Sequence, residues 1–305
     1  LRFKPIAHFG AVAWFDIKKW TAEWDTKDYL TGDSPYIFDA ALAQAAASCR
    51  NFRVTHSEKK PRKESPPAPF STSTLLQAAS IKLGFTAEKT SKLAQKLFEQ
   101  GVITYIRTDT NNLSEEASLE IREYAQQNGL SISEKIRKFD SKEGSQEAHE
   151  AIRPTHVDAT TEGSTDDEKT LYRLIWERAV ASQLADAVYS VNHLVLQATA
   201  GDKTFTFKAT GKTLVSEGWR KLTKHDAADE ETKEDSNGNV PNLEVAKTID
   251  AEKSEILNKK TKAPSRFTEA SLVKKLEAEQ IGRPATYPSI ISTNTRRGYI
   301  EMKDK

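Results

Sequence analysis

The sequence is poor in sulfur and has no long apolar run. Its 305 residues include a single cysteine and a single methionine. One cysteine, Cys49, excludes an internal disulfide framework and any zinc site built from several cysteines, and it is consistent with a reducing cytosol. No stretch approaches the roughly 18 consecutive apolar residues of a membrane-spanning helix. We therefore expect a cytoplasmic protein that does not cross a membrane.

An excess of charge of one sign is also missing. The chain has 45 Lys and Arg against 44 Asp and Glu, a net charge of +1. This balance gives no global argument for nucleic-acid binding, so such a function must come from local basic patches. Full disorder is excluded, because 12 Phe, 8 Tyr and 5 Trp supply side chains for packing. The start at Leu1 and the charged end are typical of a piece excised from a longer protein.

Two phosphate-chemistry motifs are absent. Magnesium-assisted phosphoryl transfer needs clustered carboxylates such as Asp-x-Asp-x-Glu, and nucleotide hydrolysis typically uses a Gly-x-x-x-x-Gly-Lys loop. The acidic run Asp166–Glu168 follows Thr165 and is more simply the start of a helix. We therefore predict no metal site within this chain and no hydrolysis of a nucleotide.

The length of the chain predicts two or three domains, at roughly 100–200 residues per domain, and its mixture of strand and helix patterns predicts an α+β fold. The apolar, aromatic run 7–15 indicates a sheet segment. Period-two patterns indicate paired strands at 188–198 and 203–210, joined by a turn at Gly201-Asp202, and 245–257 looks extended. The Lys- and Pro-containing segments 57–69 and 259–264 are typical of linkers, although they could also lie near a phosphate backbone. Residues 225–242 indicate a loop. Predicted helices span 38–47, Ser71 or Thr72 to Gly84, Thr86 to Gly101, Ser114 to Gly129, Thr165 through Leu184, 268–280 and 287–296.

The most informative stretch is Ile103–Asp109, which reads as a short β-like run. In an extended run Tyr105 and Arg107 project to the same side, about 7 Å apart at their Cα atoms. A fixed guanidinium favours the phenolate form of a tyrosine and can hold a phosphate oxygen. The alternative is an ordinary half-buried strand. Hydroxyl donors for phosphate or sugar are added by Thr104, Thr108 and Thr110.

Two further stretches could bind phosphate. In Gln146–Thr155, His149 and Arg153 stand four residues apart, so on a helix they would share a face and could hold a phosphodiester. The alternative is a solvated turn before a proline. In Gly282–Tyr287, Arg283 and Thr286 open a helix whose free N–H groups form an anion site. The alternative here is a plain helix–turn–helix corner.

Together these stretches resemble the type IA DNA topoisomerases, most closely the bacterial topoisomerase I group. Val102–Thr110 resembles the active-site tyrosine motif, Glu147–Thr155 the histidine motif, and Arg266–Tyr299 the late DNA-binding helices. The resemblance covers most of the chain and is most specific over 69–155 and 266–299. Residues 1–65 would equally suit a topoisomerase III-like or plasmid-borne relative.

The resemblance implies an isomerase that cuts one strand of negatively supercoiled DNA, passes another strand through the break and reseals it without ATP. Tyr105 would attack a backbone phosphorus and hold the 5′ end as a phosphotyrosine. Arg107 would orient Tyr105 and stabilise charge on the phosphate. The DNA partner, single-stranded or negatively supercoiled, would be bound by matching positions, which are Gln95, Glu99, Thr104, Thr108, Asp109, His149, Arg153, Arg283 and Thr286.

The resemblance also implies a gate. A β-rich arch would comprise 1–65 and 186–262, an inserted helical domain with Tyr105 would comprise 66–185, and part of a helical strand-binding domain would comprise 263–305. Mg²⁺ would be held by an N-terminal TOPRIM domain that this chain lacks, as it lacks a C-terminal tail. We therefore expect the fragment alone to bind no Mg²⁺ and to cleave no DNA; magnesium-dependent nicking by it is the contrary result.

Two other functions compete with strand cleavage. One is a non-catalytic module that holds single-stranded DNA with basic and aromatic residues. The other is an interaction platform for replication or conjugation partners. A covalent protein–DNA adduct that is lost in Tyr105→Phe distinguishes the enzyme from both.

Overall fold

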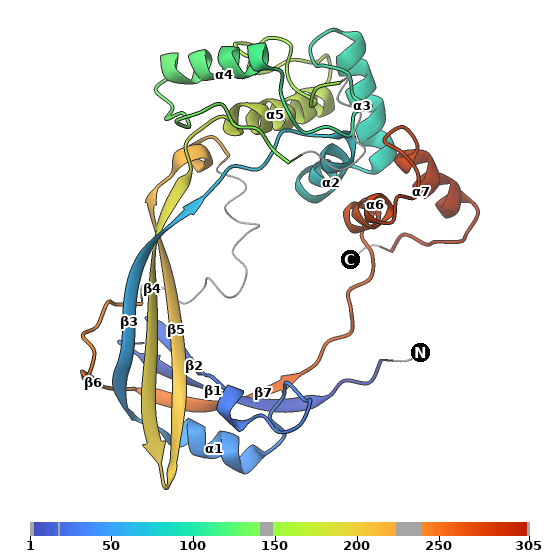
Figure 1. The fold of residues 1–305 in the computed structure, drawn as a ribbon. Coiled ribbons are helices and arrows are strands. Elements are labelled where there is room, and N and C mark those ends of the chain that lie inside the picture. The colour runs from blue at the N-terminus through green and yellow to red at the C-terminus, as the bar shows by residue number, and fades with distance from the viewer. Residues whose placement is uncertain (1–2, 18, 141–148, 224–239, 304–305) are drawn as a thin grey trace. The chain divides into compact units, whose positions relative to one another are not determined.

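The computed structural model describes residues 3–17, 19–140, 149–223 and 240–303, which divide into two compact units (Figure 1). The first, the sheet unit, takes the described parts of 1–64, 188–216 and 225–265. The second, the helical unit, takes those of 65–187, 217–224 and 266–305. Residues 266–305 thus belong to the same unit as the Tyr105 segment. A separate third domain from residue 263 stays a prediction.

The sheet unit is built on seven strands, among the described residues, in the order β6-β3-β4-β5-β2-β1-β7. The outer pair β1 and β7 joins segments that are far apart in the sequence, with Ala7 opposite Lys260 in an antiparallel register. The α+β class predicted above is confirmed at this level. The strands are β1 (Ala7–Phe15), β2 (Trp20–Trp24), β3 (Asn51–Glu64), β4 (Ala187–Ala200), β5 (Lys203–Ser216), β6 (Thr248–Asp250) and β7 (Lys253–Lys260).

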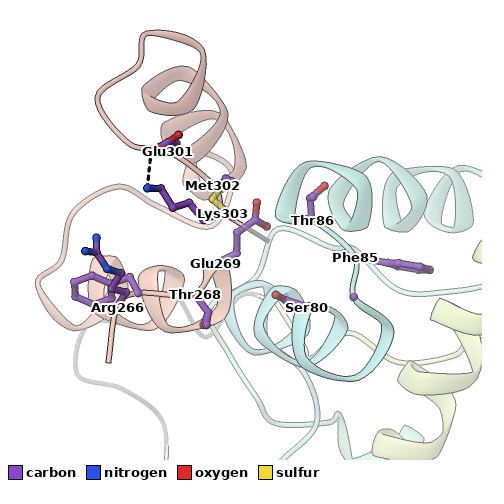
Figure 2. A pocket seen from close by; sticks show the side chains of 11 residues that line it. Ser80, Phe85, Thr86, Arg266, Thr268, Glu269, Glu301, Met302 and Lys303 are labelled. Atoms are coloured by element: carbon purple, nitrogen blue, oxygen red, sulfur yellow. Dashed lines mark ion pairs between the residues drawn. The ribbon is translucent and has the colours of Figure 1, made fainter. Parts of the chain in front are cut away.

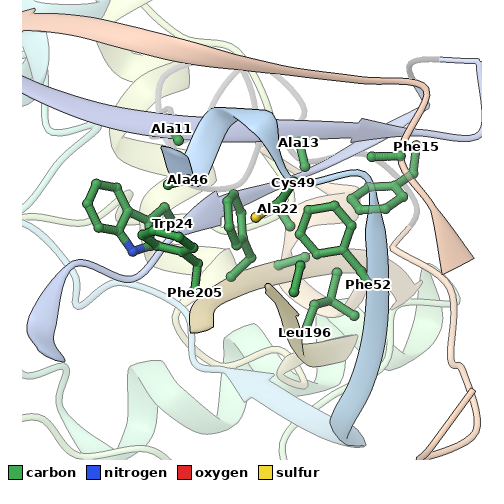
Figure 3. Packing of buried hydrophobic residues seen from close by; sticks show 14 of the residues in the cluster. Ala11, Ala13, Phe15, Ala22, Trp24, Ala46, Cys49, Phe52, Leu196 and Phe205 are labelled. Carbon is green, nitrogen blue, oxygen red and sulfur yellow. The ribbon is translucent and has the colours of Figure 1, made fainter. Parts of the chain in front are cut away.

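The β4–β5 hairpin lies in the middle of this sheet and carries much of its core. The predicted turn at Gly201-Asp202 is confirmed, and Gly201 adopts a φ of +63°. Alternate side chains of both strands point inward, so Leu196 and Phe205 are fully buried (Figure 3). The helix α1 (Ala40–Ser48), whose first N–H groups are capped by the Asp39 carboxylate, packs against β1 and β7.

The predicted linker at 57–69 is wrong over most of its length, because β3 continues through Glu64. Pro61 is tolerated inside this strand for a local reason. The ladder between β3 and β6 covers only Asn51, Phe52 and Arg53 in the described residues, so the missing N–H of Pro61 interrupts no pairing with β6. Likewise Lys259 and Lys260, predicted to start a linker, end β7.

The helices of the helical unit begin at or next to the predicted residues. Ser71, Thr86, Ser114, Thr165 and Thr268 each accept a hydrogen bond from the third N–H of the following helix. The helix that starts after Thr165 ends at Ala181, short of the predicted Leu184. The helices are α2 (Thr72–Leu83), α3 (Ala87–Glu99), α4 (Glu115–Gln127), α5 (Asp166–Ala181), α6 (Glu269–Ala278) and α7 (Tyr287–Arg296); short 3₁₀ turns lie at η1 (Lys27–Tyr29) and η2 (Gly218–Lys221).

Helices α6 and α7 pack onto α2 and α3 within the helical unit. A cluster of five buried side chains fills this contact, and the Glu269 carboxylate accepts the N–H of Ala87 at 2.7 Å. At the other end of α6, the Ser73 hydroxyl donates to Glu277 at 2.8 Å. The buried side chains are Leu76, Ala87, Val273, Tyr287 and Ile291.

Two predicted segments near the site are irregular. The stretch predicted as a strand at 102–108 forms only an isolated bridge, Ile103 with Pro154, and residues 149–155 are not helical. Residues 146–148, and most of the predicted loop at 225–242, lie outside the described residues. No helix in the described residues has the length and apolar character needed to cross a membrane.

Position 218 requires a glycine, because the backbone there has a φ of +50° and leaves no room for a Cβ atom. A Cβ there would stand 2.2 Å from the backbone oxygen of Asp186, whereas a Cβ at Gly201 would meet nothing within 4 Å. We expect Gly218→Ala to lower the free energy of unfolding by about 2–5 kcal/mol, from backbone strain plus overpacking. The matched control Gly201→Ala adds only backbone strain, about 1 kcal/mol. Denaturant unfolding measures both, and equal losses would contradict the clash.

Candidate active site around Tyr105

The backbone that carries Tyr105 is irregular but firmly held from α2. The N–H of Thr72 donates to the Thr108 oxygen at 2.9 Å, and its hydroxyl donates to the Ile106 oxygen at 2.6 Å. Ile106 and Thr108 are buried, while Tyr105 and Arg107, which alternate with them, are exposed. The alternation expected of an extended run is therefore present in the exposure pattern, without a strand.

The ring of Tyr105 contacts two other aromatic side chains, whereas its hydroxyl has no hydrogen-bond partner in the described residues. Its side chain is 38% exposed, and its ring contacts Phe98 and His149, each at 5.4 Å between centroids. Within the described residues, its hydroxyl makes no hydrogen bond. The aromatic contacts restrict the ring, and in the described residues no partner occupies the oxygen.

Arg107 is exposed and, in the described part of the chain, forms no ion pair or hydrogen bond. Its guanidinium is therefore available to an anion. A cation two residues from an exposed tyrosine can bind a phosphate oxygen bidentately, because the planar fork of arginine matches that geometry.

Thr104 joins the tyrosine segment to the histidine segment. Its hydroxyl donates to the Ala151 oxygen at 2.9 Å and accepts the N–H of Arg153 at 3.0 Å. Its N–H donates to the Arg153 oxygen at 2.9 Å. These bonds bring His149 beside Tyr105 and occupy the hydroxyl that the sequence suggested for DNA.

Arg153 does not share a helical face with His149, because no helix forms there. Its guanidinium instead makes a bidentate ion pair with Glu150, at 2.9 and 3.0 Å, and donates to the Pro154 oxygen at 2.9 Å. The pattern of residues four apart was misleading, since it presumed a regular helix. The geometry favours an internal role for Arg153.

The other positions of the first two motifs differ in access. Thr108 is only 2% exposed and accepts the N–H of Thr110, so it faces inward. Asp109 is half-buried. On α3, Gln95 donates to Glu99 at 2.9 Å, as the one-turn spacing predicts, and this pair is exposed on the helix that also carries Phe98.

Arg283 and Thr286 form the turn before α7. The Thr286 hydroxyl accepts the N–H of Arg283 at 2.8 Å and does not cap α7, so the first N–H groups of that helix keep no side-chain cap. The pKa of Tyr287 is raised, first by burial and then by the nearby carboxylates of Glu277 and Asp109. The positive charge of Arg283 partly offsets this rise in the pKa. Tyr287 therefore interacts electrostatically with Asp109 of the tyrosine segment and with Arg283 of the turn before α7.

The pocket drawn in Figure 2 is separate from these residues. It has a volume of about 480 Å³ and lies where the α2–α3 turn meets the start of α6, with Phe85, Arg266 and Met302 in its wall. None of the predicted site residues lines it.

A family model of DNA topoisomerase matches residues 1–305. The chain belongs to the type IA DNA topoisomerases. It is 43% identical to a plasmid DNA topoisomerase I of Xylella fastidiosa over 99% of this chain and 47% of that protein. It is 42% identical to DNA topoisomerase 1 of Escherichia coli over 86% of this chain and 30% of that protein.

A solved structure of full-length topoisomerase I from Thermotoga maritima matches the fold with a TM-score of 0.80 and 32% identity, over 99% of this chain and 49% of that one. This topoisomerase chain thus spans about half the length of its relatives, or less. The family uses Mg²⁺, and in the described residues no group of three or more His, Cys, Asp or Glu could hold a metal ion.

Sequence reasoning missed three residues of this topoisomerase site. Phe98 had a signal only as part of an apolar helix stripe, and Glu150 only as a carboxylate near His149. Thr72 had none, because its hydroxyl acts on a segment 34 residues away. Contacts between residues so far apart in the sequence form only when the chain folds, so no local sequence pattern predicts them.

Proposed function

We propose that, in a protein of the length of its relatives, this chain supplies the tyrosine that cuts and reseals one DNA strand. The observation that carries the proposal is Tyr105 itself. Its ring contacts Phe98 and His149, its side chain is 38% exposed, and its hydroxyl makes no hydrogen bond in the described residues. A free phenol beside an available arginine is suited to attack on a phosphodiester.

The cleavage step balances without a nucleotide cofactor. The Tyr105 oxygen bonds to phosphorus, the bond from phosphorus to the 3′ oxygen breaks, and the tyrosine proton ends on the 3′ hydroxyl. The 5′ end stays on the protein as a phosphotyrosine. Because one phosphate ester replaces another, attack by the 3′ hydroxyl reverses the step, and ATP is not required.

Arg107 would bind a non-bridging oxygen of the reacting phosphate and stabilise the charge that grows on it. His149 would contact the phosphate next to Tyr105. Gln95, Glu99 and Asp109 would line the strand path. The Mg²⁺ that the family uses would be held by acidic residues outside this chain. In the parent protein the substrate would be negatively supercoiled DNA, of which one strand is cut and another is passed through the break.

The test is covalent trapping. Full-length protein and a labelled single-stranded oligonucleotide, with Mg²⁺, are quenched with denaturant and digested. We expect a phosphotyrosyl peptide that contains Tyr105 joined to the 5′ end of the cut product. DNA binding without an adduct, or an adduct on another residue, would refute the proposal and favour a non-catalytic binding module.

A second test concerns the Arg283 turn. If Arg283 contacts a phosphate, Arg283→Ala should weaken single-strand binding and reduce the slope of log affinity against log salt by about 0.7–1. Lys203→Ala is the control, because it removes a partly exposed cation from the β4–β5 turn of the other unit. The readout is fluorescence anisotropy across a salt series. A slope that does not change in Arg283→Ala would count against the contact.

A further inference from the structure

The segment after His149 is held by an unusually complete set of bonds. The N–H of Ala151 donates to the Asn112 oxygen at 2.8 Å, and that of Ile152 to the Phe70 oxygen at 2.7 Å. The N–H of Thr155 donates to the Val102 oxygen at 3.0 Å. Three separate parts of the helical unit therefore fix the backbone immediately downstream of the histidine.

The ion pair between Glu150 and Arg153 lies inside this arrangement. Their side chains are 28% and 16% exposed, so water screens the pair only partly. Arginine has five N–H donors, and three of them are taken here by Glu150 and Pro154. A guanidinium with these partners, on a side chain that is only 16% exposed, is directed mainly into the protein.

Glu150 has a second partner. One of its oxygens accepts the N–H of Ser114, the residue that caps α4, at 3.3 Å. The carboxylate thus connects the turn of Arg153 with the start of α4. It does so at the residue directly after His149.

His149 itself has few constraints of its own. In the described residues its ring contacts Tyr105 at 5.4 Å between centroids and makes no hydrogen bond. Among the described residues, the backbone that follows His149 is therefore the segment that can hold it beside the tyrosine.

We propose that Glu150 and Arg153 are positioning residues, whose ion pair keeps His149 beside Tyr105 and does not bind DNA. This inference rests on the proposed function, because it assigns the pair to the cleavage step. Misplacement of a group by about 1 Å can cost on the order of 10²-fold in rate. The pair is therefore expected to affect the reaction while leaving DNA binding almost unchanged.

The experiment is a double-mutant cycle in the full-length protein, read as the rate of cleavage of a labelled single-stranded oligonucleotide with Mg²⁺. We expect Glu150→Gln to slow cleavage by roughly 10- to 100-fold. In a His149→Ala background, the same change should cost less than about 2-fold, because the group that it positions is gone. Equal effects in both backgrounds would overturn the proposal.

Arg153→Gln provides an independent readout. If the pair only positions His149, the salt slope of oligonucleotide binding stays that of the unsubstituted protein; a slope reduced by about 0.7–1 would mean that Arg153 contacts a phosphate and would refute the proposal. Should Arg153→Gln fail to fold, Arg153→Lys keeps the charge but loses the bidentate fork. It should then slow cleavage only when His149 is present, and slowing that persists in His149→Ala would count against the proposal.

The proposed cleavage by Tyr105 and the positioning role of Glu150 and Arg153 can be refuted separately. An adduct that survives in Tyr105→Phe would remove the proposed function itself. Loss of that adduct, combined with additive effects of Glu150→Gln and His149→Ala, would remove only the positioning role.

Discussion

Tyr105→Phe is expected to abolish the covalent protein–DNA adduct and to lower strand cleavage by on the order of 10³-fold or more, the size of effect seen when a nucleophile is removed. The physical reason is that phenylalanine keeps the ring and loses the only atom that can bond to phosphorus. Cleavage and relaxation of supercoiled plasmid by the full-length protein measure the effect.

The same substitution should leave the fold intact. The Tyr105 hydroxyl makes no hydrogen bond in the described residues, and the contacts with Phe98 and His149 are made by the ring. We therefore expect the free energy of unfolding to change by no more than about 0.5 kcal/mol. Tyr36→Phe is a matched control, since it removes a hydroxyl from a half-buried tyrosine of the sheet unit that belongs to none of the predicted sites. Relaxation that survives in Tyr105→Phe, or is lost in Tyr36→Phe, would refute the assignment of the nucleophile.

The second large effect is expected in the core of the sheet unit. Phe52 is fully buried and stands edge-on to Phe207, at 5.1 Å and 82° between the rings, and to Phe15 at 5.4 Å and 73°. Phe52→Ala would leave a cavity among these rings (Figure 3) and should lower the free energy of unfolding by about 3–5 kcal/mol.

Phe38→Ala makes the same chemical change at a side chain that is 54% exposed. It should change the free energy of unfolding by no more than about 0.5 kcal/mol. Tryptophan fluorescence during denaturant unfolding follows both variants, because Trp20 and Trp24 belong to the same core. Similar losses in the two variants would mean that Phe52 is not packed as described.

Local chemistry accounts for what could be predicted from the sequence. Ser71, Thr86, Ser114 and Thr165 cap helices where predicted, because a cap needs only a hydroxyl and the next three residues. The β4–β5 hairpin was equally predictable, since a two-residue turn with glycine and two alternating runs define it locally.

Non-local contacts account for the failures. A proline such as Pro61 can lie inside β3 only if no neighbouring strand needs its missing N–H. The residues around Pro61 do not show which strand lies next to it. The pairing of Arg153 with Glu150 depends on a turn that Thr104, 49 residues away, helps to hold. The nearness of Tyr105 and His149 was implied only by family resemblance, and no periodicity in the sequence predicts it.

The backbone on either side of Tyr105 is fastened at Thr104, whose N–H donates to the Arg153 oxygen at 2.9 Å, and at Thr108, whose N–H donates to the Thr72 hydroxyl at 3.0 Å. Within its unit, the phenol oxygen therefore moves chiefly by rotation about the Cα–Cβ bond, because it lies on the axis of the Cβ–Cγ bond. Contacts of the ring with Phe98 and His149 restrict that rotation. If Tyr105 cuts DNA as proposed, the strand has to be delivered to this oxygen, and the severed end then moves only with the unit that carries Tyr105.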